Sequence, residues 1–110
     1  MLEGIFGNKT AEKVLLHIFH YGEIHAAAIA KDYSISEHQV RNQLDRFENA
    51  NVLTSKVVGK ARVYQYNLKS PFSKSVREII KIAYDTIPLP ERESIFKQRR
   101  RPRKKGKTIT

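Results

Sequence analysis

The first apolar stripe of the chain recurs at helical spacing and comprises Ala11, Val14, Leu15, Ile18 and Phe19. This period predicts a helix with one buried face, which Thr10 can begin as its N-cap and Gly22 can end. A second helix is expected over 25–33, where four alanines allow close approach to neighbouring elements. The segment before the first helix predicts an extended or turn-like lead-in that packs Ile5 and Phe6 on the body.

A third helix is expected over 37–50, after the tight turn "YSIS". Ser36 can serve as its N-cap, and Gln39 three residues later can complete a capping box. Asn51 is expected to adopt the left-handed conformation that ends this helix, because Asn tolerates positive φ better than most residues. The polar residues of this segment surround an apolar stripe made of Val40, Leu44 and Phe47.

The period changes from helical to two in the segments "LTSKVV" and "ARVYQYNL", which are rich in β-branched and aromatic residues. Gly59 and Lys60 join them, and glycine first in a two-residue loop fits a type II′ hairpin turn. We expect Tyr64, Tyr66 and Leu68 to face the core, because they share one side of the second strand.

A fourth helix is predicted from Ser70, as N-cap, and Pro71, at the first helical position, to about residue 84 or 85. The prolines of "IPLP" end it. We therefore expect one domain over 1–87 and, over 88–110, a proline-containing linker and a basic tail that is disordered in isolation. "ERESIFKQ" within the linker could add one or two helical turns.

The predicted order is helix, helix, tight turn, helix, hairpin, so the third helix should cross the second with the hairpin beside it. "IAKDYSISEHQVRNQLDRFENANVL" resembles the helix-turn-helix of winged-helix regulators of the ArsR/MarR-like superfamily, and "SKVVGKARVYQYNL" resembles their wing. The resemblance covers about residues 10–68. It implies a mainly α fold, a winged helix-turn-helix with a three-helix core, a hairpin wing and an additional C-terminal helix. Ser34 and Asn51 stand where the family usually has glycine.

The net charge of +10 is concentrated at one end of the chain. Eight of the 21 Lys and Arg residues lie between Lys97 and Lys107 with no acid, which leaves 13 basic against 11 acidic residues over 1–96, a balance of +2. A polycationic tail on a near-neutral body points to a polyanion, usually nucleic acid.

An α-helix fits the major groove of duplex DNA and reaches base edges with its N-terminal residues. The polar face of the third helix is therefore the predicted DNA-reading surface, although most polar helix faces are simply solvated. Its candidate contacts are Ser36, His38, Gln39, Arg41, Asn42 and Arg46.

Cations outside this helix are expected on the phosphate backbone or in the minor groove. The hairpin supplies Lys56, Lys60 and Arg62, although lysines on edge strands also protect against aggregation. The tail supplies sequence-independent contacts through Arg99, Arg100, Arg101, Arg103, Lys104 and Lys105.

The apolar coverage of the fourth helix exceeds what one small body can bury, which predicts a homodimer. A two-fold dimer would place two recognition helices about 34 Å apart on a pseudo-palindromic site. Ile5 and Phe6 are further candidates for an interface made mainly of Val76, Ile79, Ile80, Ile82, Ala83, Tyr84 and Ile87.

The sequence lacks the residues that several classes of function require. The absence of Cys excludes disulfides, thiolate zinc sites and Cys nucleophiles. His17 and His20 lie at i, i+3, but no acidic partner for a metal site is evident. We find no catalytic triad order, no phosphate-binding glycine loop and no carboxylate pair, so we expect no enzymatic activity, no metal and no cofactor.

No apolar stretch approaches the ~18–20 residues of a membrane span, and no signal peptide is evident. We therefore expect a cytoplasmic, nucleoid-associated prokaryotic protein that binds double-stranded DNA as a transcription regulator. Two other functions stay open: an RNA- or ribosome-associated winged helix, and a protein-interaction module whose tail alone binds nucleic acid. The tail itself could also be a nuclear address or, least favoured, a membrane-surface anchor.

Overall fold

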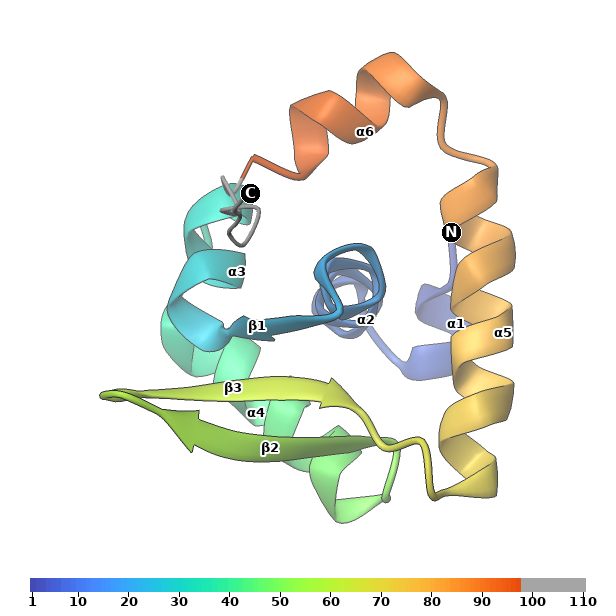
Figure 1. The fold of residues 1–110 in the computed structure, drawn as a ribbon. Coiled ribbons are helices and arrows are strands. Elements are labelled where there is room, and N and C mark those ends of the chain that lie inside the picture. Colours follow the sequence, from blue (N-terminus) through green and yellow to red (C-terminus); the bar gives the residue numbers. More distant parts are fainter. Residues whose placement is uncertain (98–110) are drawn as a thin grey trace, which may run out of the picture.

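The computed structural model describes residues 1–97, which form six helices and one three-stranded antiparallel sheet (Figure 1). The strand order is β1-β3-β2. α2 lies at the centre of the fold, with α3 on one side and α1 and α5 on the other (Figure 1). In chain order the elements are α1 (Glu3–Phe6), α2 (Lys9–Tyr21), β1 (Glu23–His25), α3 (Ala26–Tyr33), α4 (Glu37–Asn49), β2 (Leu53–Val58), β3 (Ala61–Tyr66), α5 (Pro71–Asp85) and α6 (Leu89–Ile95).

α2 begins earlier than the sequence predicted. Asn8, not Thr10, is the N-cap, because its extended backbone lets its side-chain Oδ1 accept the N–H of Ala11 at 2.8 Å. Gly22 ends the helix as predicted, with φ of 85° and its N–H donated to the carbonyl of Ile18. The buried face of α2 forms the centre of the hydrophobic core.

α4 has the start and the orientation that the sequence predicted. The Ser36 Oγ accepts the N–H of Gln39 at 3.1 Å, and the Gln39 side chain accepts the N–H of Ser36, so the capping box is complete. Ser34 and Asn51 adopt positive φ of 55° and 64° at the two ends of this segment. The stripe that holds the helix against the core is buried and consists of Val40, Leu44 and Phe47.

β2 and β3 form the predicted hairpin, and Gly59 has the positive φ of 63° that its loop requires. Tyr66 is buried, with its hydroxyl donated to the carbonyl of Leu15 at 2.8 Å, and Tyr64 is buried beside it. The prediction for Leu68 is wrong: β3 ends at Tyr66, so the alternation stops and Leu68 is 85% exposed.

β1 was not predicted, because a strand of three residues is too short to show an alternating pattern. It pairs with β3, with Ile24 opposite Tyr64, and extends the hairpin to a three-stranded sheet. The expectation of a mainly α chain with a hairpin is thus confirmed only in part: residues 1–97 form a mixed α/β domain.

The lead-in before α2, predicted to be extended or turn-like, is the four-residue helix α1. Phe6 packs edge-on against Phe47, with ring centroids 6.1 Å apart, and is buried as expected. Ile5, expected to pack on the body, is exposed instead. α5 begins at Pro71 after Ser70, as predicted, although the Ser70 hydroxyl makes no capping hydrogen bond.

The packed part of the chain continues past residue 87, where the sequence placed the start of a linker. α6 crosses one end of the molecule from α5 to α3 (Figure 1), and Phe96 after it is only 8% exposed. Residues 88–97, which we call the C-terminal strap, therefore belong to the domain. None of the helices within residues 1–97 combines the length and apolar character needed to cross a membrane.

Candidate nucleic-acid interface

The outward side of α4 is accessible, as the sequence predicted. His38, Gln39, Arg41 and Asn42 are exposed there. The guanidinium of Arg41 pairs with the carboxylate of Glu37 one turn earlier, and the Arg41 side chain still keeps 62% of its exposure. The Asn42 amide nitrogen lies 3.4 Å from the His38 Nε2. This face therefore offers amide, imidazole and guanidinium groups to a partner.

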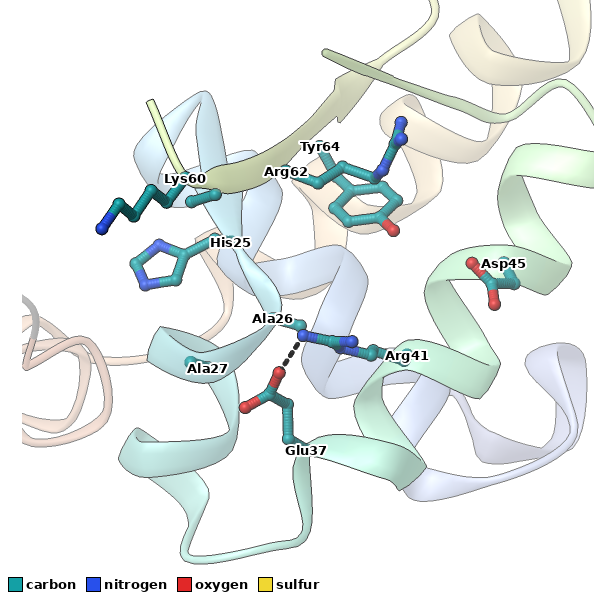
Figure 2. Close-up of a pocket in the computed structure, with 10 residues that line it drawn as sticks. His25, Ala26, Ala27, Glu37, Arg41, Asp45, Lys60, Arg62 and Tyr64 are labelled. Atoms are coloured by element: carbon teal, nitrogen blue, oxygen red, sulfur yellow. Dashed lines mark hydrogen bonds and ion pairs between the residues drawn. The ribbon is translucent and has the colours of Figure 1, made fainter. Parts of the chain in front are cut away.

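A groove with a volume of about 460 Å³ separates α4 from the tip of the hairpin and from the start of α3 (Figure 2). In Figure 2 the Arg41 guanidinium extends from α4 toward Ala26 at the start of α3, with Glu37 beneath it. Three cations and two acids contribute to the walls. The lining residues are His25, Ala26, Ala27, Glu37, Arg41, Asp45, Lys60, Ala61, Arg62 and Tyr64.

Neighbouring polar groups orient the far wall of the groove. The Arg62 Nη1 donates to the Ser55 Oγ at 2.9 Å, and that hydroxyl donates to the Glu48 Oε2 at 2.6 Å. Burial raises the pKa of Tyr64, and the carboxylates of Asp45 and Glu48 raise it further, so its hydroxyl stays protonated and able to donate. We call the exposed face of α4 together with this groove the α4–hairpin surface. Its two arginines, one lysine and one phenol can bind an anion.

Lys56 does not join this surface. Its Nζ pairs with the Glu23 Oε1 at 3.2 Å, across β3. Lys56 is opposite Val63 and its neighbour Val57 is opposite Arg62, and successive residues of a strand point to opposite faces. Lys56 therefore lies on the other face of the sheet from Arg62.

Arg46 has an internal contact that the sequence did not reveal. Its guanidinium donates to the backbone carbonyl of Phe6 and lies over the ring of Phe47, 4.9 Å from the centroid. It thereby fastens α1 to the end of α4, outside the groove. Ser36 and Gln39 are likewise engaged with each other in the capping box, so their main role in this structure is to begin α4.

The face predicted for dimerisation is largely used within the chain. Ile80, Ala83 and Ile87 are buried in the core, which corrects their placement in an interface between chains. Val76, Ile79 and Tyr84 are partly buried against the core, and only Ile82, at 68%, is fully exposed. The buried residues are covered because α5 packs against α2 and β3 of the same chain.

A buried His–Asp pair also escaped the sequence analysis. The His17 Nε2 lies 2.8 Å from the Asp32 Oδ2, and both side chains are almost completely buried. Burial lowers the pKa of His17 more than the hydrogen bond and charge of Asp32 raise it. The residues are fifteen apart on different helices, so spacing gave no signal. Within residues 1–97 no cluster of three or more His, Cys, Asp or Glu side chains could hold a metal ion.

The structure thus brings Arg41, Asn42, Lys60 and Arg62 to one surface and leaves Lys56 and Arg46 outside it. The tail residues from Arg99 to Lys105 lie outside the described residues. His25 and Tyr64 line the groove but were not among the predicted contacts, since neither lies in α4 or is a hairpin lysine or arginine. No protein-family model matches the chain, and no curated protein is significantly similar to it.

Proposed function

We propose that this chain binds duplex DNA in a sequence-dependent manner, as a winged-helix transcription regulator with α4 as recognition helix and the β2–β3 hairpin as wing. One observation carries the proposal. The apolar stripe of α4 is buried, while Arg41 and Asn42 between its members are exposed beside a groove that contains further cations. A helix held by one face with the other face presented in this way can enter a major groove.

The chemistry of the α4–hairpin surface suits the two parts of such a contact. Asn42 can bond the edge of adenine, and Arg41 can bond guanine or a phosphate. Because a guanidinium has five N–H donors, Arg41 can keep Glu37 as a partner while it donates to DNA. Lys60 and Arg62 would then contact the phosphate strand that runs between the major groove and the adjacent minor groove.

The double substitution Arg41→Ala with Asn42→Ala is expected to relax sequence preference. Each bidentate base contact contributes about 1–3 kcal/mol of discrimination, so the ratio of affinities for selected and random duplexes should fall at least tenfold. Selection from a random DNA pool provides the preferred duplex, and fluorescence anisotropy measures both affinities.

Lys74→Ala is the matched control, because it removes an exposed cation from α5 without touching the α4–hairpin surface. Its affinity ratio should equal that of the unaltered protein. No enrichment in the selection, or an unchanged ratio in the double variant, would show that α4 does not read DNA. Tighter binding to structured RNA than to duplex DNA in a competition would favour an RNA-binding function instead.

We also infer that the protein acts as a homodimer through the exposed part of α5. Phe72 near its start and Ile82 near its end are both large, apolar and exposed, with the half-buried Ile79 between them. Exposed apolar side chains grouped in this way mark interaction sites on soluble domains.

Ile82→Asp is therefore expected to convert dimers to monomers, because a carboxylate would be buried without a partner in the interface. Multi-angle light scattering measures the mass of each variant. Val58→Asp places the same charge on an exposed apolar position of the hairpin, away from α5, and should leave the mass unchanged. Dimers that persist in Ile82→Asp would place the interface elsewhere.

A further inference from the structure

The C-terminal strap carries the chain across the molecule before the basic run begins. α5 ends at Asp85 on one side of the domain, and α6 leads from there to α3 on the opposite side (Figure 1). Without the strap, the chain would leave the domain beside the end of α5. The strap therefore decides where the cations that follow it start.

Aromatic contacts in the middle and at the far end fix the strap to the body. In the middle the Arg92 guanidinium lies over the ring of Tyr84, 4.3 Å from the centroid, and its Nε donates to the carbonyl of Ile87 at 2.8 Å. At the far end Phe96 is buried and stacks on His20, with ring centroids 4.2 Å apart and planes 6° from parallel.

The last described residue is fixed beside the helix-turn-helix segment. The backbone N–H of Lys97 donates to the Asp32 Oδ2 at 3.2 Å. Asp32 precedes Ser36, the N-cap of α4, by four residues, so their Cα atoms lie at most ~14 Å apart by chain reach. The run of eight Lys and Arg residues from Lys97 to Lys107 thus starts close to the N-terminal end of α4.

We propose that the C-terminal strap is a positioning device that delivers the basic run to the phosphate backbone flanking the groove that α4 enters. This inference rests on the proposed DNA-binding function and adds the route of the tail to it. A helix that enters the major groove by its N-terminal end has phosphates on either side of that end. Because the basic run starts near the N-terminal end of α4 and not at the end of α5, its cations have a higher effective concentration at these phosphates.

Two variants that keep every cation test the device. Phe96→Ala removes the buried anchor at the far end, so the basic run follows a segment that is held only as far as Arg92. Insertion of a flexible Gly-Ser spacer between Lys97 and Gln98 leaves the strap docked and moves only the start of the run. Each change is expected to weaken binding to a short mixed-sequence DNA duplex about five- to tenfold, because effective concentration falls with linker length.

Leu89→Ala is the matched control within the strap, since Leu89 is apolar but 69% exposed, and its affinity should match the unaltered protein. Circular dichroism confirms that each variant is folded, and the spacer variant decides the case if Phe96→Ala unfolds. Unchanged affinity in the spacer variant would overturn the positioning role.

The sequence preference separates this inference from the proposed function. If the strap idea alone fails, the spacer variant binds normally while Arg41→Ala with Asn42→Ala still loses its preference. If the proposed function fails, the double variant changes nothing. A unique Gln98→Cys, available because the chain has no Cys, can carry an iron–EDTA cleaver. Cleavage should fall beside the selected sequence in the docked protein and spread along the duplex in Phe96→Ala.

Discussion

Truncation after Lys97 is expected to weaken binding to duplex DNA a hundredfold or more at low salt and to flatten the salt dependence. The truncation removes seven Lys and Arg residues and no acid. Each phosphate contact releases counterions and contributes about 0.9 to the slope of log K against log salt, so the slope should decrease by up to ~6. Fluorescence anisotropy over a series of salt concentrations gives both quantities.

The loss should be the same on selected and random duplexes, because a run of cations without aromatic residues between them reads charge and not sequence. A variant with these seven residues changed to Gln keeps the length and should behave like the truncation. If the slope keeps its full value in both variants, the phosphate contacts come from the folded domain. If the truncation also abolishes sequence preference, the tail and α4 do not have separate roles.

Local signals in the sequence predicted α4, the helix to which we assign the sequence preference, and the hairpin beside it. The start of α4 depends on Ser36 and Gln39, which are three residues apart and form the capping box. The orientation of α4 depends on its apolar stripe at helical spacing. The hairpin turn needs only the positive φ of Gly59. Such features are decided within a few residues, so a pattern in one sequence reveals them.

The missed features depend on contacts between distant segments. β1 forms because Ile24 pairs with Tyr64, forty residues away in the chain. The strap docks on the body because Phe96 stacks on His20. Arg46 looked like a DNA contact because it lies on a polar helix face, yet its guanidinium is held by the Phe6 carbonyl. Side-chain type and spacing predicted where a residue lies along an element but not which partner it meets.

The same limit explains the buried pair of His17 and Asp32, which joins α2, α3 and the strap. Asp32 accepts hydrogen bonds from the His17 ring and from the Lys97 N–H. Both carboxylate and imidazole are removed from water, so the imidazole depends on the carboxylate for its hydrogen bond. The pair therefore connects the stability of the domain with the position at which the basic run begins.

Asp32→Ala is expected to lower the free energy of unfolding by about 3 kcal/mol, because it leaves the buried His17 ring without its partner and frees the Lys97 N–H. Urea denaturation followed by circular dichroism at neutral pH measures this change. Asp32→Asn keeps an acceptor oxygen for His17 and should recover part of the loss. A change below about 1 kcal/mol, the value of an ordinary exposed ion pair, would mean that the pair contributes little.

The pH dependence distinguishes this pair from simple packing. Burial holds the pKa of His17 below its ordinary value of 6.5, while Asp32 raises it and His20 lowers it. Since the folded state binds the His17 proton less tightly than the unfolded chain, the contribution of His17 to the free energy of unfolding should be constant above about pH 7. It should then decrease as the pH falls through 6.5 toward the lowered pKa, by at most about 1.4 kcal/mol per pH unit for this proton.

Loss of the Asp32 carboxylate removes the contribution that raises the pKa of His17, so in Asp32→Ala the decrease should continue to lower pH than in the unaltered protein. His17→Gln has no such proton and should lose most of the dependence. The remainder should come from His20, whose pKa burial and Arg92 also lower. Equal pH profiles for the unaltered protein and His17→Gln would show that His17 does not titrate with unfolding.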